Sequence, residues 1–296
     1  MDALNRYKFD RYSHSGEDGI VQEIFLRLAN QSIGLDRYCC EFGAWDGIHL
    51  SNTARLIKEQ GYKAVLIEGD SKRMNELKEN FPGENVTKIC SFIQPSGPQS
   101  IDNLLTTTTI PTNFDFLSID IDGMDYYILE SMEIYRPKLI CIEINPTIPN
   151  TVSFVQEKNS SVKHGASALA VLELAEAKGY VLVAATQCNL FLLKQELLAY
   201  VLPTKADLNE VFLAGLDVQY IFSGYDGTIL SNKSHISLGW HGSLPLEKWQ
   251  LLPRFLRKYS GDYSSFQRLC FLIFFLWKRF SFASLWRTSR RFFNEK

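Results

Sequence analysis

The alternation of short apolar runs with helical stretches constrains the fold of this chain most strongly. The apolar runs are typical of buried strands, and they cover residues 38–43, 63–70, 85–93, 114–123 and 137–145. Stretches with helical periodicity cover residues 15–29, 51–61, 71–81, 100–105, 124–132 and 167–179. Strands that alternate with helices predict an α/β fold with a parallel sheet and right-handed crossovers. Two further runs, 180–186 and 188–194, predict a hairpin whose last strand is antiparallel to its neighbour.

A glycine turn follows the first predicted strand, in the sequence CCEFGAWDGIHLSN. Glu41, Gly43 and Gly47 form an E-x-G-x-x-x-G pattern, which is neither a pyrophosphate fingerprint nor a P-loop. Gly43 lets the backbone approach a ligand closely, and Gly47 can adopt a positive φ. Ser51 or Asn52 is the expected N-cap of the next helix, and Gly61 its stop. The simplest alternative is a glycine turn and a surface Glu in an α/β domain without a ligand.

The next predicted strand ends in Glu68. A carboxylate at this place accepts two hydrogen bonds from a ribose diol in nucleotide sites. Glu41 can pair with a ligand ammonium group. A ribose and an ammonium group without a phosphate cradle indicate S-adenosylmethionine as the ligand.

Several segments together resemble the FkbM-type S-adenosylmethionine-dependent methyltransferases, over about residues 12–195. They are YSHSGEDGIVQEIF, CCEFGAWDGIHLSNT, KAVLIEGD, DFLSIDIDGMDYYILESM, PKLICIEINPTIP and GASALAVLELAEAKGYVLVAATQCNLFLL. The resemblance implies a class I methyltransferase fold, a Rossmann-like, mostly parallel sheet of seven strands with an antiparallel last strand. It also implies O-methylation, often of sugar hydroxyls in glycans, glycolipids or natural products. His14 stands where an amide side chain is expected, so its part in the cofactor lid stays open.

The resemblance carries cofactor contacts onto particular positions of this chain. Ser91 and Phe92 fall where adenine rests, Glu68 falls at the ribose, and Asp120 lies near the sulfonium. The implied cofactor-binding residues are Glu41, Gly43, Asp46, Gly47, Asn52, Glu68, Ser91, Phe92 and Asp120.

Carboxylates cluster after the fourth and fifth predicted strands. Asp120, Asp122 and Asp125 follow one strand, and Glu143 and Asn145 end the neighbouring strand, whose tip lies about 5 Å away. Such carboxylates repel one another unless they are protonated, solvated or bound to a cation. Oxygen ligands suit Mg²⁺ or another divalent cation, so Asp120, Asp122, Glu143 and Asn145 are the candidate ligands. The alternative is that Asp122 or Asp125 caps the helix and Glu143 faces water.

His164 lies on the loop after the fifth predicted strand and is a candidate general base. A lone histidine on a loop is also often only exposed. Together with Asp120 and Asp122 it completes the set of candidate catalytic residues. The bound metal would acidify the hydroxyl that is methylated.

Three regions are expected along the chain: a methyltransferase domain at 1–200, an acceptor-site extension at 201–253 and a basic aromatic tail at 254–296. The extension offers Tyr225, His235, Trp240 and His241 as polar and aromatic candidates, with ordinary packing as the simpler interpretation.

The tail has ten basic and two acidic residues, a net charge of +8, whereas the rest of the chain carries −10. Its basic residues flank Phe and Trp, and its nine-residue apolar run 269–277 is too short to span a bilayer. Peripheral membrane contact through 264–296 is the expectation; packing on the body or in a homodimer is the alternative. The charge also suits nucleic acid, but no recognition motif supports that partner.

The sequence therefore predicts an S-adenosylmethionine-dependent O-methyltransferase with a sugar-containing acceptor. N- or carboxyl-methylation on the same fold, and a non-catalytic S-adenosylmethionine-binding module, are the alternatives. The N-terminus has no apolar segment typical of a signal peptide. A cytoplasmic location follows as an expectation, with the tail at the inner membrane face.

Overall fold

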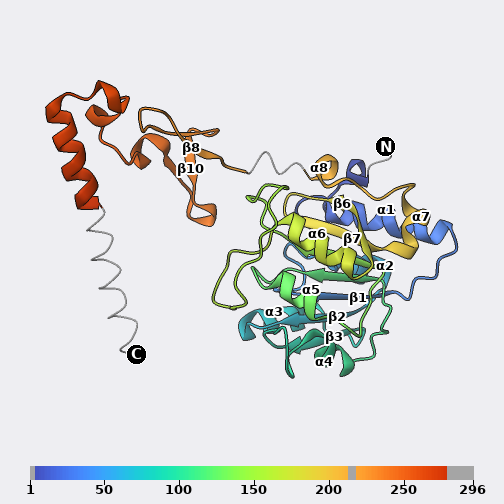
Figure 1. Ribbon diagram of the computed structural model, residues 1–296. Coiled ribbons are helices and arrows are strands. Elements are labelled where there is room, and N and C mark those ends of the chain that lie inside the picture. Colours follow the sequence, from blue (N-terminus) through green and yellow to red (C-terminus); the bar gives the residue numbers. More distant parts are fainter. Residues whose placement is uncertain (1–3, 213–217, 279–296) are drawn as a thin grey trace. The chain divides into compact units, whose positions relative to one another are not determined.

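The computed structural model describes residues 4–212 and 218–278 (Figure 1). The chain divides into two compact units, Met1–Val218 and Gln219–Lys296. The division falls inside the segment 201–253, because Val201, Leu202 and Leu208 pack into the cores of the first unit. Residues 279–296, which hold much of the predicted basic aromatic tail, lie outside the described residues.

The first unit is built on a seven-stranded sheet. Its strands are β1 (Tyr38–Phe42), β2 (Lys63–Glu68), β3 (Val86–Cys90), β4 (Phe116–Ile119), β5 (Leu139–Glu143), β6 (Tyr180–Ala185) and β7 (Asn189–Lys194). Their order is β3-β2-β1-β4-β5-β7-β6. The pairs among β1 to β5 are parallel, and β7 is antiparallel to both β5 and β6. The predicted class I methyltransferase fold is thus confirmed, with the antiparallel last strand inserted between β5 and β6.

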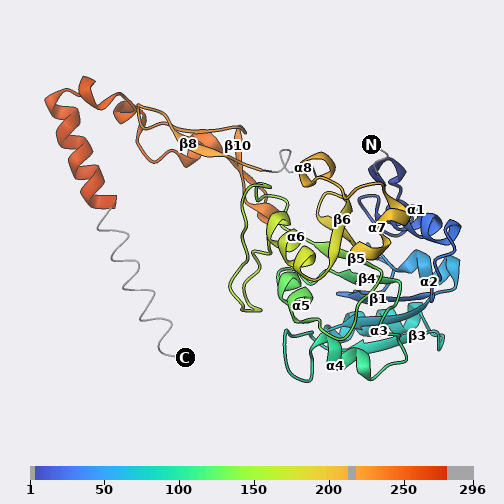
Figure 2. The ribbon, with the colours of Figure 1, turned by 45° about the vertical axis from the view of Figure 1, so that its right-hand side comes forward.

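Helices cover both faces of the sheet (Figures 1 and 2). They are α1 (Glu17–Asn30), α2 (Ala54–Gln60), α3 (Ser71–Asn80), α4 (Ile101–Thr106), α5 (Asp125–Ser131), α6 (Ala168–Ala177), α7 (Leu198–Val201) and α8 (Leu208–Val211), with 3₁₀ turns at Leu4–Tyr7 and Gln195–Leu197. Successive strand residues point to opposite faces, so Cys39 packs in one core and Cys40 in the other. The helices α1, α2, α3 and α7 cover the Cys39 face, and α4, α5, α6 and α8 cover the Cys40 face.

The predicted ends of α2 are partly confirmed. Gly61 ends the helix in the left-handed conformation, with φ 69°, which glycine adopts without steric cost. The predicted N-cap at Ser51 or Asn52 is wrong, since the N-cap residue is Thr53. Ser51 still acts near this end, because its hydroxyl oxygen accepts the backbone N–H of Ala54 at 3.0 Å.

The amino ends of β4 and β5 hold a buried ion pair. The Lys138 ammonium lies 2.8 Å from a carboxylate oxygen of Asp115 and 2.7 Å from one of Asp36. Asp115 also accepts the backbone N–H groups of Asp36 and Arg37. Burial lowers the pKa of Lys138, but hydrogen bonds and charges from Asp115 and Asp36 outweigh this and raise it. The buried charges at this edge of the sheet are therefore paired with one another within the chain.

The described part of the second unit, residues 219–278, contains two small hairpins, several 3₁₀ turns and one helix. Its elements are β8 (Ile221–Ser223), β9 (Ile229–Ser231), β10 (His235–Ser237), β11 (Ser243–Pro245), 3₁₀ turns at Gly239–His241, Leu246–Trp249, Arg254–Leu256 and Ser260–Asp262, and a helix over 265–278. The hairpins pair β8 with β9 and β10 with β11. Tyr225, His235 and His241 are exposed, while the side chain of Trp240 lies outside the described part.

Candidate functional site

The glycine turn after β1 brings two strand ends together. Gly43 has φ 69°, and a Cβ added there would lie 1.8 Å from the carbonyl oxygen of Asp120. Gly43 is therefore required because the chain after β1 passes close to the end of β4. The sequence had suggested that a ligand, not the chain itself, approaches the backbone here. Gly47 has the predicted positive φ, at 77°, and a Cβ there would lie 2.6 Å from the Phe81 ring.

Glu41 is buried and holds the chain that leads into α2. Its carboxylate accepts the hydroxyls of Ser51 and Thr53, both at 2.6 Å, and the backbone N–H of Asn52 at 2.8 Å. Burial raises the pKa of Glu41, and these hydrogen bonds oppose the shift. Glu41 therefore has three partners within the chain, whereas the sequence suggested a ligand ammonium.

Asn52 is also buried, and it links the turn to the sheet. Its amide nitrogen donates to the hydroxyl of Ser118 in β4 at 3.0 Å. Asp46 accepts the backbone N–H groups of Ile48 and His49 at 2.9 and 2.7 Å. The side chains of Asn52 and Asp46 thus form hydrogen bonds that hold the turn. A cofactor would then contact the backbone that these side chains hold.

Glu68 lies at the carboxyl end of β2, half-buried. One carboxylate oxygen accepts the backbone N–H of Trp45 at 2.8 Å, and the other accepts that of Asp70 at 2.7 Å. A carboxylate oxygen can accept a second bond, so Glu68 retains capacity for a diol. The fixed orientation of its carboxylate suits the predicted ribose role.

Phe92 and Ser91 lie directly beside Glu68. The Ser91 backbone N–H donates to the Glu68 carbonyl oxygen at 3.0 Å. The Phe92 ring packs against Gly69, where an added Cβ would lie 2.3 Å from the ring, yet the residue is 68% exposed. An exposed aromatic face next to a candidate ribose ligand suits the predicted contact with adenine.

Three carboxylates meet at the tips of β4 and β5. Asp120, Asp122 and Glu143 each place an oxygen within 4.8 Å of the other two. Burial and the neighbouring charge of Asp122 raise the pKa of Asp120 to about 6. Burial and the charges of Asp120, Asp125 and Asp122 raise the pKa of Glu143 to about 9. This acidic cluster therefore favours either a shared proton or a bound cation.

The loop that carries the cluster is held from beneath by Asp125. Its buried carboxylate accepts the backbone N–H groups of Ile121 and Gly123 at 2.9 and 2.8 Å. Asp122 has φ 55°, a left-handed conformation that costs energy for a residue other than glycine. The alternative that Asp122 or Asp125 caps the helix is wrong, because the N-cap residue of α5 is Met124 without a side-chain hydrogen bond. Asp125 holds the preceding loop, and Asp122 belongs to the cluster.

The two candidate ligands of β5 differ. Glu143 joins the acidic cluster, but Asn145 does not offer a free amide oxygen. That oxygen accepts the backbone N–H and the hydroxyl of Thr147 at 2.9 and 2.6 Å, and its nitrogen donates to the His164 carbonyl at 2.8 Å. Asn145 therefore fixes the following loop in place of the metal-binding role expected from the sequence.

His164 is exposed on the long loop between β5 and α6, residues 144–167. Buried Gln156 organises this loop: its amide oxygen accepts the backbone N–H groups of His164 and Gly165, and its nitrogen donates to the Val162 carbonyl. Loops longer than about 15 residues are often functional, and this length was the available sequence signal for a site here. Gln156 belongs to no sequence motif, so its role in this loop was not predicted.

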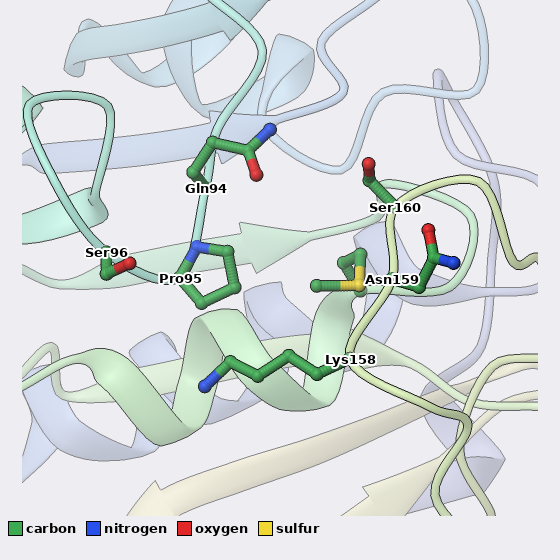
Figure 3. A pocket seen from close by; sticks show the side chains of 7 residues that line it. Gln94, Pro95, Ser96, Lys158, Asn159 and Ser160 are labelled. Carbon is green, nitrogen blue, oxygen red and sulfur yellow. The ribbon is translucent and has the colours of Figure 1, made fainter.

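A polar recess of about 460 Å³ is lined in part by Met124, which lies on the loop after β4. It is lined by Gln94, Pro95, Ser96, Met124, Lys158, Asn159 and Ser160. Figure 3 shows residues 94–96 on one side of the recess and 158–160 on the other. Met124 lies two residues after Asp122, so the recess and the cluster share one loop. Its volume falls in the range of about 300–1,000 Å³ that ligand pockets occupy.

Comparison with protein families bears on the class of this domain. Residues 91–182 match a family model described as "Methyltransferase FkbM domain". This match confirms the resemblance and the methyltransferase class predicted from the sequence, and it implies S-adenosylmethionine as cofactor. The acidic cluster and the recess lie within the matched segment, while Glu41 and Glu68 precede it.

The chain is also similar to solved structures. The citrinin polyketide synthase CMeT domain is 14% identical, with a TM-score of 0.39 over 62% of this chain and 54% of that one. A SAM-dependent methyltransferase from Aquifex aeolicus is 13% identical, with a TM-score of 0.33 over 62% and 97%. An O-methyltransferase from Bacillus cereus in complex with SAH is 18% identical, with a TM-score of 0.36 over 62% and 84%. The chain thus spans about half the length of the first of these, and no curated protein matches it by sequence.

Proposed function

We propose that this chain transfers the methyl group of S-adenosylmethionine to a hydroxyl of a sugar-containing acceptor. One observation carries the proposal: the carboxylates of Asp120, Asp122 and Glu143 lie within 4.8 Å of one another, and the recess beginning at Met124 opens on the same loop. Methyl transfer to a hydroxyl requires a base near the acceptor oxygen, because this oxygen becomes positively charged as it is methylated and must lose its proton. Amide, hydroxyl and ammonium groups in the recess suit an acceptor rich in hydroxyls.

S-Adenosylmethionine supplies an electrophilic methyl group on a positively charged sulfur. When it is bound, Glu68 would hold the ribose, the exposed ring of Phe92 would lie against adenine, and the acidic cluster would face the positive charge. The methyl group would pass to the acceptor oxygen with loss of the carbon–sulfur bond, and Asp120 would accept the hydroxyl proton. The products are a methyl ether and S-adenosylhomocysteine, with one proton released for each methyl group.

Asp120 is the preferred base because its raised pKa, about 6, lies close to neutral pH. A base with a pKa near the working pH combines a high ionised fraction with a useful proton affinity. His164 is a second candidate base, since it is exposed on the 144–167 loop. Burial and the neighbouring aspartates raise the pKa of Glu143 to about 9, so without a cation it is neutral near pH 7 and is not the base.

A divalent cation is a further part of the proposal. Asp120, Asp122 and Glu143 fit such an ion, because three carboxylate oxygens within 4.8 Å can reach one centre. Asn145 is left out of this ligand set, since its amide oxygen is already used. A bound ion would lower the pKa of an acceptor hydroxyl.

Transfer of a radiolabelled methyl group to glycan and glycolipid fractions tests this function. We expect label that is stable to mild alkali and that appears in O-methyl sugars after acid hydrolysis, because a methyl ether resists alkali. Alkali-labile label would instead identify carboxyl methylation, and label on an amine would identify N-methylation. A chain that binds the cofactor tightly and labels no fraction would support the non-catalytic binding module.

The metal is tested in the same assay. If the acidic cluster binds Mg²⁺ for catalysis, EDTA should abolish transfer while S-adenosylhomocysteine binding is retained, and Asp122→Asn should have the same effect without the chelator. The reason is that one lost carboxylate removes a third of the protein ligands. Asp262→Asn, in the second unit, is the control. Full activity in excess EDTA would exclude the metal role and leave Asp120 as a base acting alone.

A further inference from the structure

The helix at 265–278 exposes an apolar face to solvent. Its outward residues follow the i, i+3, i+4, i+7 spacing of one helix face. They are Phe266, Leu269, Leu272, Ile273, Leu276 and Trp277, each between 41% and 70% exposed. A contiguous apolar face of this kind marks an interaction surface.

The opposite face of the same helix attaches it to its own unit. Gln267 donates from its amide nitrogen to the Phe255 carbonyl at 2.9 Å, and the Phe271 ring lies 5.9 Å from the Tyr263 ring. Gln267, Phe271, Phe274 and Lys278 are only half-exposed. The helix is thus apolar on both sides: Phe271 and Phe274 lie on the attached side, and the six outward residues are exposed.

Positive charge surrounds the apolar face. Arg268 is exposed at its border, and Lys278 lies at the end of the described helix, with its ammonium 5.2 Å from the Trp277 ring centre. Between residues 254 and 278 the chain has five basic residues and one acidic residue, Asp262. In the printed sequence, residues 279–296 add five basic residues and one acidic residue. The partner of this face should therefore be both apolar and negatively charged.

The length of the helix excludes a spanning role for the described part. Its 14 residues extend about 21 Å at 1.5 Å per residue, whereas the hydrocarbon core of a bilayer is about 30 Å thick. No helix within residues 4–212 or 218–278 is both long and apolar enough to cross a membrane. The composition of the described helix, apolar with basic residues beside it, suits a helix in the plane of the membrane interface.

We propose that the face formed by Phe266, Leu269, Leu272, Ile273, Leu276 and Trp277 docks on the surface of a bilayer that contains anionic lipids. The apolar side chains enter the acyl boundary, and Arg268, exposed at the border of the face, meets the anionic headgroups. Lipid is favoured over a second copy of the chain because a pair of such faces would bring the basic residues of both copies together.

Co-sedimentation of the full chain with vesicles tests the proposal. The protein should sediment with phosphatidylcholine vesicles that contain phosphatidylglycerol at low salt, and it should sediment less with phosphatidylcholine alone or at high salt. The variant Leu272→Glu/Leu276→Glu should lower the bound fraction at least about ten-fold, since two buried apolar side chains are replaced by charges.

A matched control is available in the same unit. Leu238 and Leu244 are exposed leucines near the small hairpin, at 44% and 42%, so Leu238→Glu/Leu244→Glu makes the same change in charge away from the helix. This control should sediment like the unchanged protein, and both variants should keep their circular dichroism and S-adenosylhomocysteine binding. The proposal would be overturned if the unchanged protein stays in the supernatant. Sedimentation velocity would then show whether the protein is a monomer, with the face covered internally, or a dimer. Equal loss of binding in both variants would overturn it as well.

Discussion

Replacement of Asp120 by Asn should lower the rate of methyl transfer by about 10²–10⁴-fold, the range typical of a lost general base. The amide cannot accept the hydroxyl proton, although it has nearly the same shape. Binding of S-adenosylhomocysteine, which lacks the positive charge of the donor, should change less than about ten-fold. Glu133→Gln, an exposed carboxylate just after α5, is the matched control and should keep full activity.

The pH dependence of the rate provides an independent test of Asp120. Its pKa is raised to about 6, mainly by burial and by the charge of Asp122, and the base acts only when it is unprotonated. The rate should therefore fall as the pH drops through this value. The positive charge of the bound donor lowers the pKa, so the acid limb should lie at or below about 6. Retention of most activity by Asp120→Asn, or the same acid limb in that variant, would assign the base to another group such as His164.

Replacement of Lys138 by Met should destabilise the first unit by about 3–5 kcal/mol, because it leaves the buried Asp115 carboxylate without its countercharge. The control is Lys205→Met. Lys205 lies 2.6 Å from Glu176 on the surface, and an exposed pair contributes only about 0–1 kcal/mol. Urea unfolding followed by circular dichroism measures both variants.

The same experiment separates the two edges of the sheet. Lys138 and Asp115 lie at the amino ends of the strands, whereas the acidic cluster lies at the carboxyl ends. The folded Lys138→Met protein should therefore bind S-adenosylhomocysteine as the unchanged protein does. Equal stability of the two lysine variants would show that the buried pair is not a main source of stability. Loss of cofactor binding at full stability would contradict the placement of the site.

The sequence was sufficient to predict the sheet because its strands are short, apolar and separated by helices with clear ends. Gly61 and Gly179 both have the positive φ that the helix stops required, at 69° and 80°. The hairpin predicted the antiparallel strand, but not that β7 lies between β5 and β6, since strand order depends on contacts between distant residues. The N-cap at Thr53 also depends on contacts between distant residues, because the hydroxyls of Ser51 and Thr53 donate to the carboxylate of Glu41 in β1.

The meeting of the three carboxylates was predicted, and the hydrogen bonds around them were not. Asp120, Asp122 and Glu143 meet because neighbouring parallel strands end at one edge, a relation that the order of the sequence reveals. The sequence cannot show that Thr147 and His164 already use the amide of Asn145. The recess could not be predicted, because its 158–160 side is positioned by hydrogen bonds of Gln156, a residue that belongs to no motif.

Calorimetric titration with S-adenosylhomocysteine tests the central claim, that the cofactor binds at the carboxyl edge beside Glu68. The unchanged protein should bind it at one site, and Glu68→Ala should weaken binding by about 10–100-fold, the effect of losing a hydrogen-bonded charged group. Glu76→Ala, which removes a carboxylate from the exposed face of nearby α3, should bind like the unchanged protein. If the unchanged protein gives no binding, or if Glu68→Ala binds as tightly as Glu76→Ala, the cofactor site is not the one described.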